Sequence, residues 1–260
     1  MDAPQILDAA ERLLRAQAEL IPIEPLTETY GDFPISDAYL IQKTVIDKRL
    51  LAGRRVVGKK IGLTSEPMQK FVGVDEPDYG QILDNMVFDD CSALQMSQMI
   101  APRVEAEIGA LLKKDLVGPG VTAFDAARAC EAVFPLLEII DSRVKDWKIR
   151  IQDTVADNAS SWGVVFGSTL FSPNGIDLSL VGLTVRLNGR PISHGVGAAV
   201  LGSPYRSLAW LANKMAEYGT PLRAGESVLL GSLVAAFVIQ PGDNVLAMFD
   251  GVGHVSAIFE

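Results

Sequence analysis

Two glutamates stand one residue apart in an otherwise apolar stretch, and they limit what this chain can fold into. Glu105 and Glu107 lie in the run from Val104 to Leu112, which is typical of a β-strand. Residues i and i+2 of a strand project to one face, so both carboxylates point the same way, with their Cα atoms roughly 7 Å apart. Burying two unpaired like charges is costly. Either a hard divalent cation such as Mg²⁺ or Mn²⁺ lies between them, or this is an edge strand with a solvated acidic face.

A third acidic residue, Glu138, lies in the equally apolar run from Phe134 to Ile140. A charged residue in such a run is rarely buried without a partner. One interpretation pairs Glu138, or the nearby Asp141, with Arg143 in a structural ion pair. The other makes Glu138 a third oxygen ligand beside the two glutamates above, which suits Mg²⁺ because that ion keeps several non-protein ligands. Asp141 is an alternative third ligand.

Two consecutive lysines, Lys59 and Lys60, lie between glycines in a segment that predicts another strand. Neighbouring strand residues point to opposite faces, so one lysine can point inward. An inward lysine beside a metal would hold a substrate carboxylate or move a proton, with its pKa lowered by the cation. The alternative is a pair of solvated lysines.

Two further polar segments fit either a site or ordinary turn chemistry. Residues 76–80 contain Asp78 in a turn-rich loop, and residues 157–161 form a polar cluster inside otherwise structured chain.

Charge and composition exclude several classes of protein. A net charge of −9 argues against nucleic-acid or anionic-membrane partners. No apolar run reaches the roughly 18 residues of a membrane span, and no signal peptide is visible at the N-terminus. Two cysteines, Cys91 and Cys130, fit a reducing compartment. We therefore expect a cytoplasmic protein.

Familiar catalytic motifs are missing. Only two histidines, His194 and His254, are present, and the chain has no G-x-S-x-G elbow and no G-x-x-x-x-G-K-[ST] phosphate loop. Residues 195–200 only faintly match a dinucleotide fingerprint and do not open a long helix. A zinc site is disfavoured because Cys and His are few and scattered. Among the kinds of active site considered, one built on carboxylate side chains is left.

The hydrophobic pattern predicts a mostly β core with peripheral helices. We expect helices over residues 4–18, 36–51, 122–132 and 204–218, and strands over residues 56–63, 105–112, 134–140, 181–187, 191–194, 228–230, 244–249 and 254–259. Asn188-Gly189 marks a hairpin. The order is not a regular βαβ alternation, so the class is α+β. Residues 1–53 look like a small N-terminal helical unit, and residues 54–260 look like the main domain.

Seven segments together resemble one family. They are residues 58–65, 76–80, 102–108, 137–143, 153–160, 197–202 and 209–213. In order along the chain, they are similar to the hydratase/decarboxylase branch of the fumarylacetoacetate hydrolase superfamily, and within it to the 2-hydroxypenta-2,4-dienoate (2-oxopent-4-enoate) hydratases.

The resemblance implies a distorted, mostly antiparallel β-roll and a Mg²⁺ or Mn²⁺ enzyme of the meta-cleavage degradation of aromatic compounds. It implies a small 2-oxo or 2-hydroxy dienoate substrate, a homo-oligomer, and association with a decarboxylase or hydratase of the same pathway. Carried over residue by residue, it assigns metal ligands to Glu105, Glu107 and Glu138, catalytic roles to Lys60 and Asp78, and substrate contacts to Ser160 and Leu63.

Four readings of this resemblance stay open, and one of the more distant is a hydrolase that cuts a C–C bond in an acylpyruvate. The first is the hydratase, favoured by residues 145–154 and 231–234. The second is a 2-oxo-3-hexenedioate (4-oxalocrotonate) decarboxylase, favoured by residues 235–238 and 241–244. A dicarboxylate would need a second cationic anchor, for which Arg103 and Arg143 are candidates. The third is a catalytically silent partner subunit, which would have no reason to keep such costly buried charge.

Overall fold

The two apolar runs that carry the glutamates form neighbouring antiparallel strands at the centre of the larger sheet. These strands, β5 (Arg103–Leu112) and β6 (Cys130–Ile140), are paired so that Glu105 lies directly opposite Glu138. The computed structural model describes residues 1–65, 69 and 74–260. Within those residues, the larger sheet has the order β2-β1-β10-β5-β6-β7-β3, and β11 also pairs with β5. Its other strands are β1 (Val56–Gly62), β2 (Asp78–Leu83), β3 (Val87–Asp89), β7 (Ser161–Phe166), β10 (Ser227–Ser232) and β11 (Phe237–Val238).

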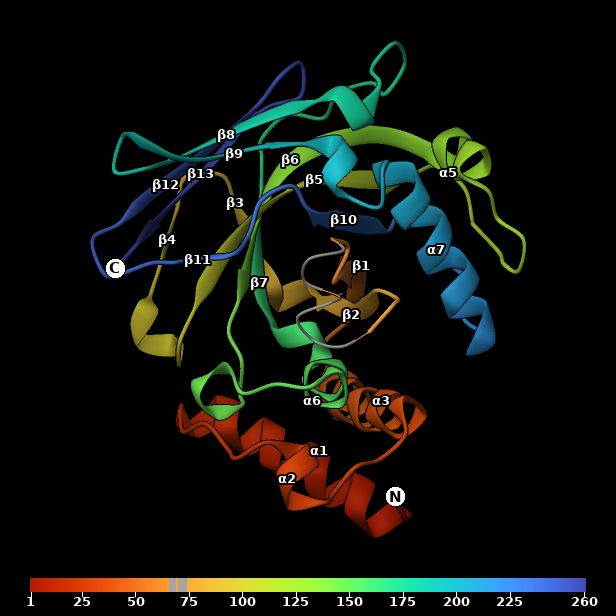
Figure 1. The fold of residues 1–260 in the computed structure, drawn as a ribbon, viewed down its shortest axis with the longest axis vertical. Coiled ribbons are helices and arrows are strands. Elements are labelled where there is room, and N and C mark those ends of the chain that lie inside the picture. The colour runs from red at the N-terminus through yellow and green to blue at the C-terminus, as the bar shows by residue number, and fades with distance from the viewer. Residues whose placement is uncertain (66–68, 70–73) are drawn as a thin grey trace.

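A second sheet covers one side of this curled sheet (Figure 1), in the order β4-β13-β12-β8-β9. Its strands are β4 (Ser92–Leu94), β8 (Gly182–Leu187), β9 (Arg190–Val196), β12 (Asn244–Phe249) and β13 (Gly253–Phe259). Parallel pairing occurs between β1 and β10, β3 and β7, and β4 and β13, while the other pairs are antiparallel. The predicted α+β class with a mostly antiparallel, curled core is confirmed.

Helices cover the ends of the sheets. Figure 1 shows the N-terminal helices together at one end of the molecule, with α3 beside α6, and α7 along the flank that lies across from the smaller sheet. The helices are α1 (Ala3–Glu19), α2 (Leu26–Thr29), α3 (Ile35–Leu51), α5 (Ala123–Ala129), α6 (Ile151–Ala156) and α7 (Pro204–Glu217). Short 3₁₀ turns are η1 (Asp84–Met86), η2 (Met96–Gln98), η3 (Lys145–Trp147), η4 (Asn158–Ser160), η5 (Leu178–Leu180) and η6 (Gly197–Ala199). No helix in the described ranges is long and apolar enough to cross a membrane.

Most predicted elements are present, and the errors have physical causes. The helix expected over residues 122–132 ends at Ala129, because buried Cys130 already adopts extended φ/ψ and begins β6. Strands β2 and β7 were missed, since both are short and follow polar segments. Asp78, expected in a loop, is the first residue of β2.

The N-terminal helices share a core with the sheets. Asp2 caps α1 through a reciprocal capping box with Gln5, and the buried stripe of α1 includes Leu13. This stripe and the buried face of α3 belong to the same continuous apolar cluster as buried residues of both sheets, such as Ile108 and Val255. The division into units 1–53 and 54–260 stays a prediction.

The inner face of the larger sheet has an apolar end. A separate small cluster there includes Ile82, Phe134, Leu136, Val164 and Leu229. By strand alternation, Leu136 shares the face of Glu138, and Leu229 pairs with Gly109 of β5. The glutamates therefore lie on the same inner face as this apolar cluster.

We expect Gly109→Ala to destabilise the fold. A Cβ atom at Gly109 would lie 2.4 Å from Cε2 of Phe134, whose ring fills the space beside β5. Alanine ordinarily suits a strand interior better than glycine, by roughly 0.5–1 kcal/mol. Here the overlap should reverse the sign and lower the free energy of unfolding by about 1–3 kcal/mol in urea titrations. An unchanged or raised midpoint would show that the ring moves freely.

Candidate active site

The structure brings three carboxylates to one point. Glu105, Glu107 and Glu138 each offer a carboxylate oxygen, and these atoms lie within 4.8 Å of one another. Alternation along β5 sends the first two to the same face, and the register with β6 supplies the third. Glu107 and Glu138 are 1% and 0% exposed. The interpretation of an edge strand with a solvated acidic face is therefore wrong.

The carboxylate of Glu138 lacks hydrogen-bond donors. Neither of its oxygens accepts a hydrogen bond from any group in the described parts of the chain, although Lys60 Nζ lies 3.0 Å from Oε1. Glu107 accepts one hydrogen bond, from the backbone N–H of Gly231 at 2.8 Å. Buried carboxylates with so few hydrogen-bond donors fit a hard divalent cation. Such a cation neutralises their negative charge and binds the oxygen atoms that lack donors.

The energetic strain of this cluster appears in its pKa values. Burial raises the pKa of Glu105 to about 7, although the positive charge of Lys60 opposes the shift. Burial raises the pKa of Glu107 well above its usual value, and the negative charges of Glu138 and Glu105 add to the effect. The trio is therefore unfavourable in its fully ionised form without a counter-charge.

Lys60 lies against this trio from β1. Its Nζ atom approaches Glu138 and donates a hydrogen bond to the carbonyl of Ala159 at 3.0 Å. Lys59 points to the opposite face and pairs with Glu226 at 2.6 Å. Both lysines are 3% exposed, so the solvated interpretation is wrong. Burial lowers the pKa of Lys60, but the surrounding carboxylates, Glu138 first, outweigh burial and raise it. A bound cation, expected to lower this pKa, would act against them.

Asp78 approaches the same inner face from β2. It pairs with Gly62 of β1, where a Cβ atom would lie only 2.2 Å from Asp78 Oδ1 and 3.6 Å from Lys60 Nζ. A glycine is needed there so that both side chains fit. Burial raises the pKa of Asp78 to about 6, while Lys60 opposes the shift, and Thr154 donates a hydrogen bond to its carboxylate at 3.4 Å.

A strained turn leads from Asp157 to β7. Asn158, Ala159 and Ser160 all have positive φ, at 57°, 51° and 55°. Asn158 fixes the turn to β2 through two hydrogen bonds with the backbone of Gln81, at 2.8 and 2.9 Å. Three successive left-handed residues other than glycine persist only where the surroundings hold them. The turn thereby presents the Ala159 carbonyl to Lys60.

The two predicted substrate contacts are Ser160, which ends this turn, and Leu63, which follows β1. Ser160 is 2% exposed, and its hydroxyl lies 3.5 Å from Asp157 Oδ2. Leu63 directly follows β1, is half-buried and has a φ of 55°.

Arg143 and Asp141 have structural partners. Arg143 forms a buried ion pair with Asp157, and its Nη1 atom donates to the carbonyls of Asp141 and Ser161 at 2.7 and 3.1 Å. Asp141 accepts the backbone N–H groups of residues 100 and 101, at 2.8 and 2.6 Å. The predicted ion pair of Arg143 with Glu138 or Asp141 is therefore wrong. Asp141 is not in the carboxylate group that the described residues form.

Ser161 is a site residue that the sequence did not single out. A bulge between β6 and β7 places it opposite Ile140, on the face of Glu138. It is 3% exposed, its hydroxyl helps to lower the pKa of Glu138, and yet that hydroxyl has no hydrogen-bond partner within the described residues. Residues 157–161 are recognisably polar, but no sequence pattern shows a bulge.

Glu107→Gln should stabilise the metal-free protein at pH 8. The raised pKa means that the folded state disfavours ionised Glu107, a penalty present above the folded pKa and absent below the unfolded pKa of about 4.5. Glutamine removes that charge. We expect the free energy of unfolding in EDTA to rise by about 1–3 kcal/mol at pH 8 and to change little at pH 5. Exposed Glu19→Gln serves as the control, and a less stable Glu107→Gln variant at pH 8 would contradict the electrostatic account.

Comparison with known proteins places this geometry among relatives. The family model of the fumarylacetoacetate (FAA) hydrolase C-terminal region matches residues 63–259. A 2-keto-4-pentenoate hydratase of Paraburkholderia xenovorans (strain LB400) is 46% identical over 260 residues, covering 100% of this chain and 97% of the relative. A 4-oxalocrotonate decarboxylase of Pseudomonas putida is 37% identical over 259 residues, covering 100% and 98%.

Solved structures of similar proteins show the same fold as this chain. The 4-oxalocrotonate decarboxylase from Pseudomonas putida G7, complexed with magnesium and adipate, superposes with a TM-score of 0.98 at 36% identity and covers 100% of this chain and 99% of its own. The same enzyme complexed with calcium and acetate gives a TM-score of 0.96 at 35% identity over the same shares of the two chains.

Proposed function

Because the chain belongs to the fumarylacetoacetate hydrolase family, as its sequence predicts, we propose that it is a metal-dependent hydratase. It adds water to 2-hydroxypenta-2,4-dienoate and yields 4-hydroxy-2-oxopentanoate, a step of meta-cleavage degradation of aromatic compounds. The full-length relative at 46% identity carries a hydratase name. The observation that carries the proposal is the trio of carboxylates, of which Glu107 and Glu138 are buried and Glu105 is half-buried, with Lys60 in contact with Glu138.

We assign the metal to Glu105, Glu107 and Glu138. Their oxygens are close enough to share one ion, and the unsatisfied oxygens of Glu138 support the assignment. Relatives bind magnesium and calcium, so the ion is divalent, and Mg²⁺ or Mn²⁺ suits the carboxylate set. When bound, the ion supplies Lewis-acid stabilisation of negative charge on the C2 oxygen of the substrate.

The other residues have roles that follow from their positions. Lys60, held by Glu138 and the Ala159 carbonyl, orients the substrate carboxylate. Asp78 has a pKa of about 6, which suits a group that takes up and releases a proton near neutral pH as the dienol ketonises and water adds at C4. Ser160 and Leu63 contact the substrate.

The decarboxylase reading is the second candidate, because a decarboxylase shares both the full-length sequence match and the fold. Its dicarboxylate substrate needs a second cationic anchor. Of the two arginines considered from the sequence, Arg143 is held by Asp157, and Arg103 stacks over the ring of Trp147 at 4.6 Å. The pairing of Arg143 with Asp157 removes one of these two anchors, which supports the monocarboxylate substrate of a hydratase.

Assembly as a homo-oligomer, association with a decarboxylase or hydratase of the pathway, and a cytoplasmic location stay predictions of the resemblance and the composition.

A single assay tests the proposal. The purified protein receives 2-hydroxypenta-2,4-dienoate or 2-oxo-3-hexenedioate, with Mg²⁺ or with EDTA, while absorbance loss and CO₂ release are followed. We expect Mg²⁺-dependent loss of the monocarboxylate without CO₂, and a fall in turnover of at least about 10³-fold in Glu107→Gln. Full activity of Glu107→Gln would contradict the assignment of Glu107 as a metal ligand. Release of CO₂ from the dicarboxylate faster than loss of the monocarboxylate would favour the decarboxylase.

Ser161→Ala should weaken metal binding without unfolding the protein. The Ser161 hydroxyl is close enough to Glu138 to help lower the pKa of that carboxyl, and it has no hydrogen-bond partner in the described ranges, so we expect it to orient the Glu138 carboxylate. Such supporting contacts typically contribute about 10-fold or more to metal affinity. Calorimetric titration with Mn²⁺ measures the loss directly, and Ser161→Thr, which keeps a hydroxyl, should restore part of it. Equal affinity in Ser161→Ala would remove Ser161 from the site.

A further inference from the structure

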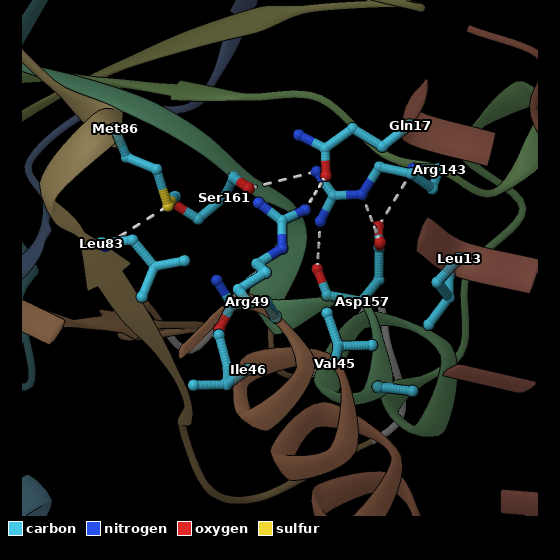
Figure 2. Close-up of a pocket in the computed structure, with 12 residues that line it drawn as sticks. Leu13, Gln17, Val45, Ile46, Arg49, Leu83, Met86, Arg143, Asp157 and Ser161 are labelled. Atoms are coloured by element: carbon cyan, nitrogen blue, oxygen red, sulfur yellow. Dashed lines mark hydrogen bonds and ion pairs between the residues drawn. The ribbon is translucent and has the colours of Figure 1, made fainter. Parts of the chain in front are cut away.

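A hollow that none of the three glutamates lines lies between the N-terminal helices and the start of β7 (Figure 2). Its lining includes Gln17 of α1, Arg49 of α3, Met86, and the polar turn around Asp157. An open cleft adjoins it and shares Gln17, Arg49 and Met86. None of the three glutamates, Lys60 or Asp78 lines either space.

The charges around this hollow do not balance. Three charged side chains line it, namely Arg49, Arg143 and Asp157. Asp157 is occupied by Arg143, which donates to both its carboxylate and its backbone carbonyl. Arg49 forms no ion pair with any described residue, and its Nη2 atom donates to the neutral side chain of Gln17. One positive charge is left over in a chain whose net charge is −9.

Arg49 is also held in an unfavourable place. Burial, with the Arg143 guanidinium adding to it, lowers the pKa of Arg49 to about 10. Figure 2 shows its guanidinium group among Gln17, Ser161 and Asp157. Partly buried arginines are usually paired with an anion, for which the planar guanidinium offers a fork of donors.

The adjoining cleft provides an apolar wall. Phe88 and Trp162 stack with ring centroids 5.6 Å apart and planes 7° from parallel, and both rings line the cleft together with Leu20. The positive charge of Arg49 thus lies at one end of the cleft, beside a flat aromatic surface. This combination recognises a planar molecule with one anionic end.

We infer that Arg49 anchors the carboxylate of a small planar organic acid, an aromatic or conjugated monocarboxylate, whose body lies against Phe88 and Trp162. Of the residues placed at the metal or the substrate above, only Ser161 lines this hollow, so the inferred site adjoins the reaction site without containing its catalytic residues. It gives the leftover charge of Arg49 a partner and the aromatic wall of the cleft an occupant.

The test uses benzoate as the probe and benzamide as its neutral match. Calorimetric titration of the Mg²⁺-loaded protein should show saturable binding of benzoate, with benzamide at least about tenfold weaker, because only the carboxylate pairs with Arg49. Arg49→Gln should weaken benzoate binding by at least about tenfold. Arg54→Gln removes the same charge from an exposed position five residues further along the chain, and it should leave the benzoate affinity within about twofold of the unaltered protein.

Several outcomes would overturn the inference. The inference fails if benzoate does not bind, if benzamide binds as tightly as benzoate, or if inorganic phosphate does. It also fails if the Arg49→Gln variant binds benzoate as tightly as the unaltered protein, which is the result expected if the benzoate carboxylate binds the metal instead. Should Arg49→Gln not fold, a crystal of the unaltered protein soaked with 4-bromobenzoate decides. Anomalous bromine density beside Trp162 supports the site, and its absence there overturns it.

Discussion

Like-charge repulsion among three clustered carboxylates, two of them fully buried, is the interaction on which the rest of this structure depends. Glu105, Glu107 and Glu138 place three potential negative charges within 4.8 Å, and Lys60 supplies one positive charge in contact. Water screens these charges poorly, because Glu107 and Glu138 are 1% and 0% exposed and only Glu105 is half-buried. The fold therefore holds an arrangement that is complete only when a cation is added. Stability is given up here for function, as is common at active sites.

The surrounding structure keeps the carboxylates in place. Antiparallel pairing of β5 and β6 sets the distance between Glu105 and Glu138, and Gly62 leaves the space in which Asp78 and Lys60 approach each other. Behind them, the Arg143–Asp157 pair holds the strained turn that faces Lys60. Each support is a backbone or buried polar contact, and such contacts are more rigid than exposed side chains.

Much of this could be predicted from the sequence, for identifiable reasons. Glu105 and Glu107 were readable because a period of two in an apolar run fixes their common face, and Glu138 because a lone charge in such a run needs a partner. Asp78 was recognised as a site candidate but placed in a loop, since the glycine and proline around it resemble a turn. The true partner of Arg143 and the inward position of Ser161 depend on a long-range contact and a bulge, which no local pattern encodes.

The way in which this site is assembled bears on how the protein folds. Lys60 and Glu138 are far apart in the chain, and the strands β1 and β6 that carry them are separated in the sheet by β10 and β5. Their meeting requires most of the sheet to have closed, and contacts of such long range form late. A metal ion would then recognise little before the final state and would act mainly by slowing unfolding. The lifetime of the native molecule, more than the speed at which it forms, would depend on the supply of divalent ions.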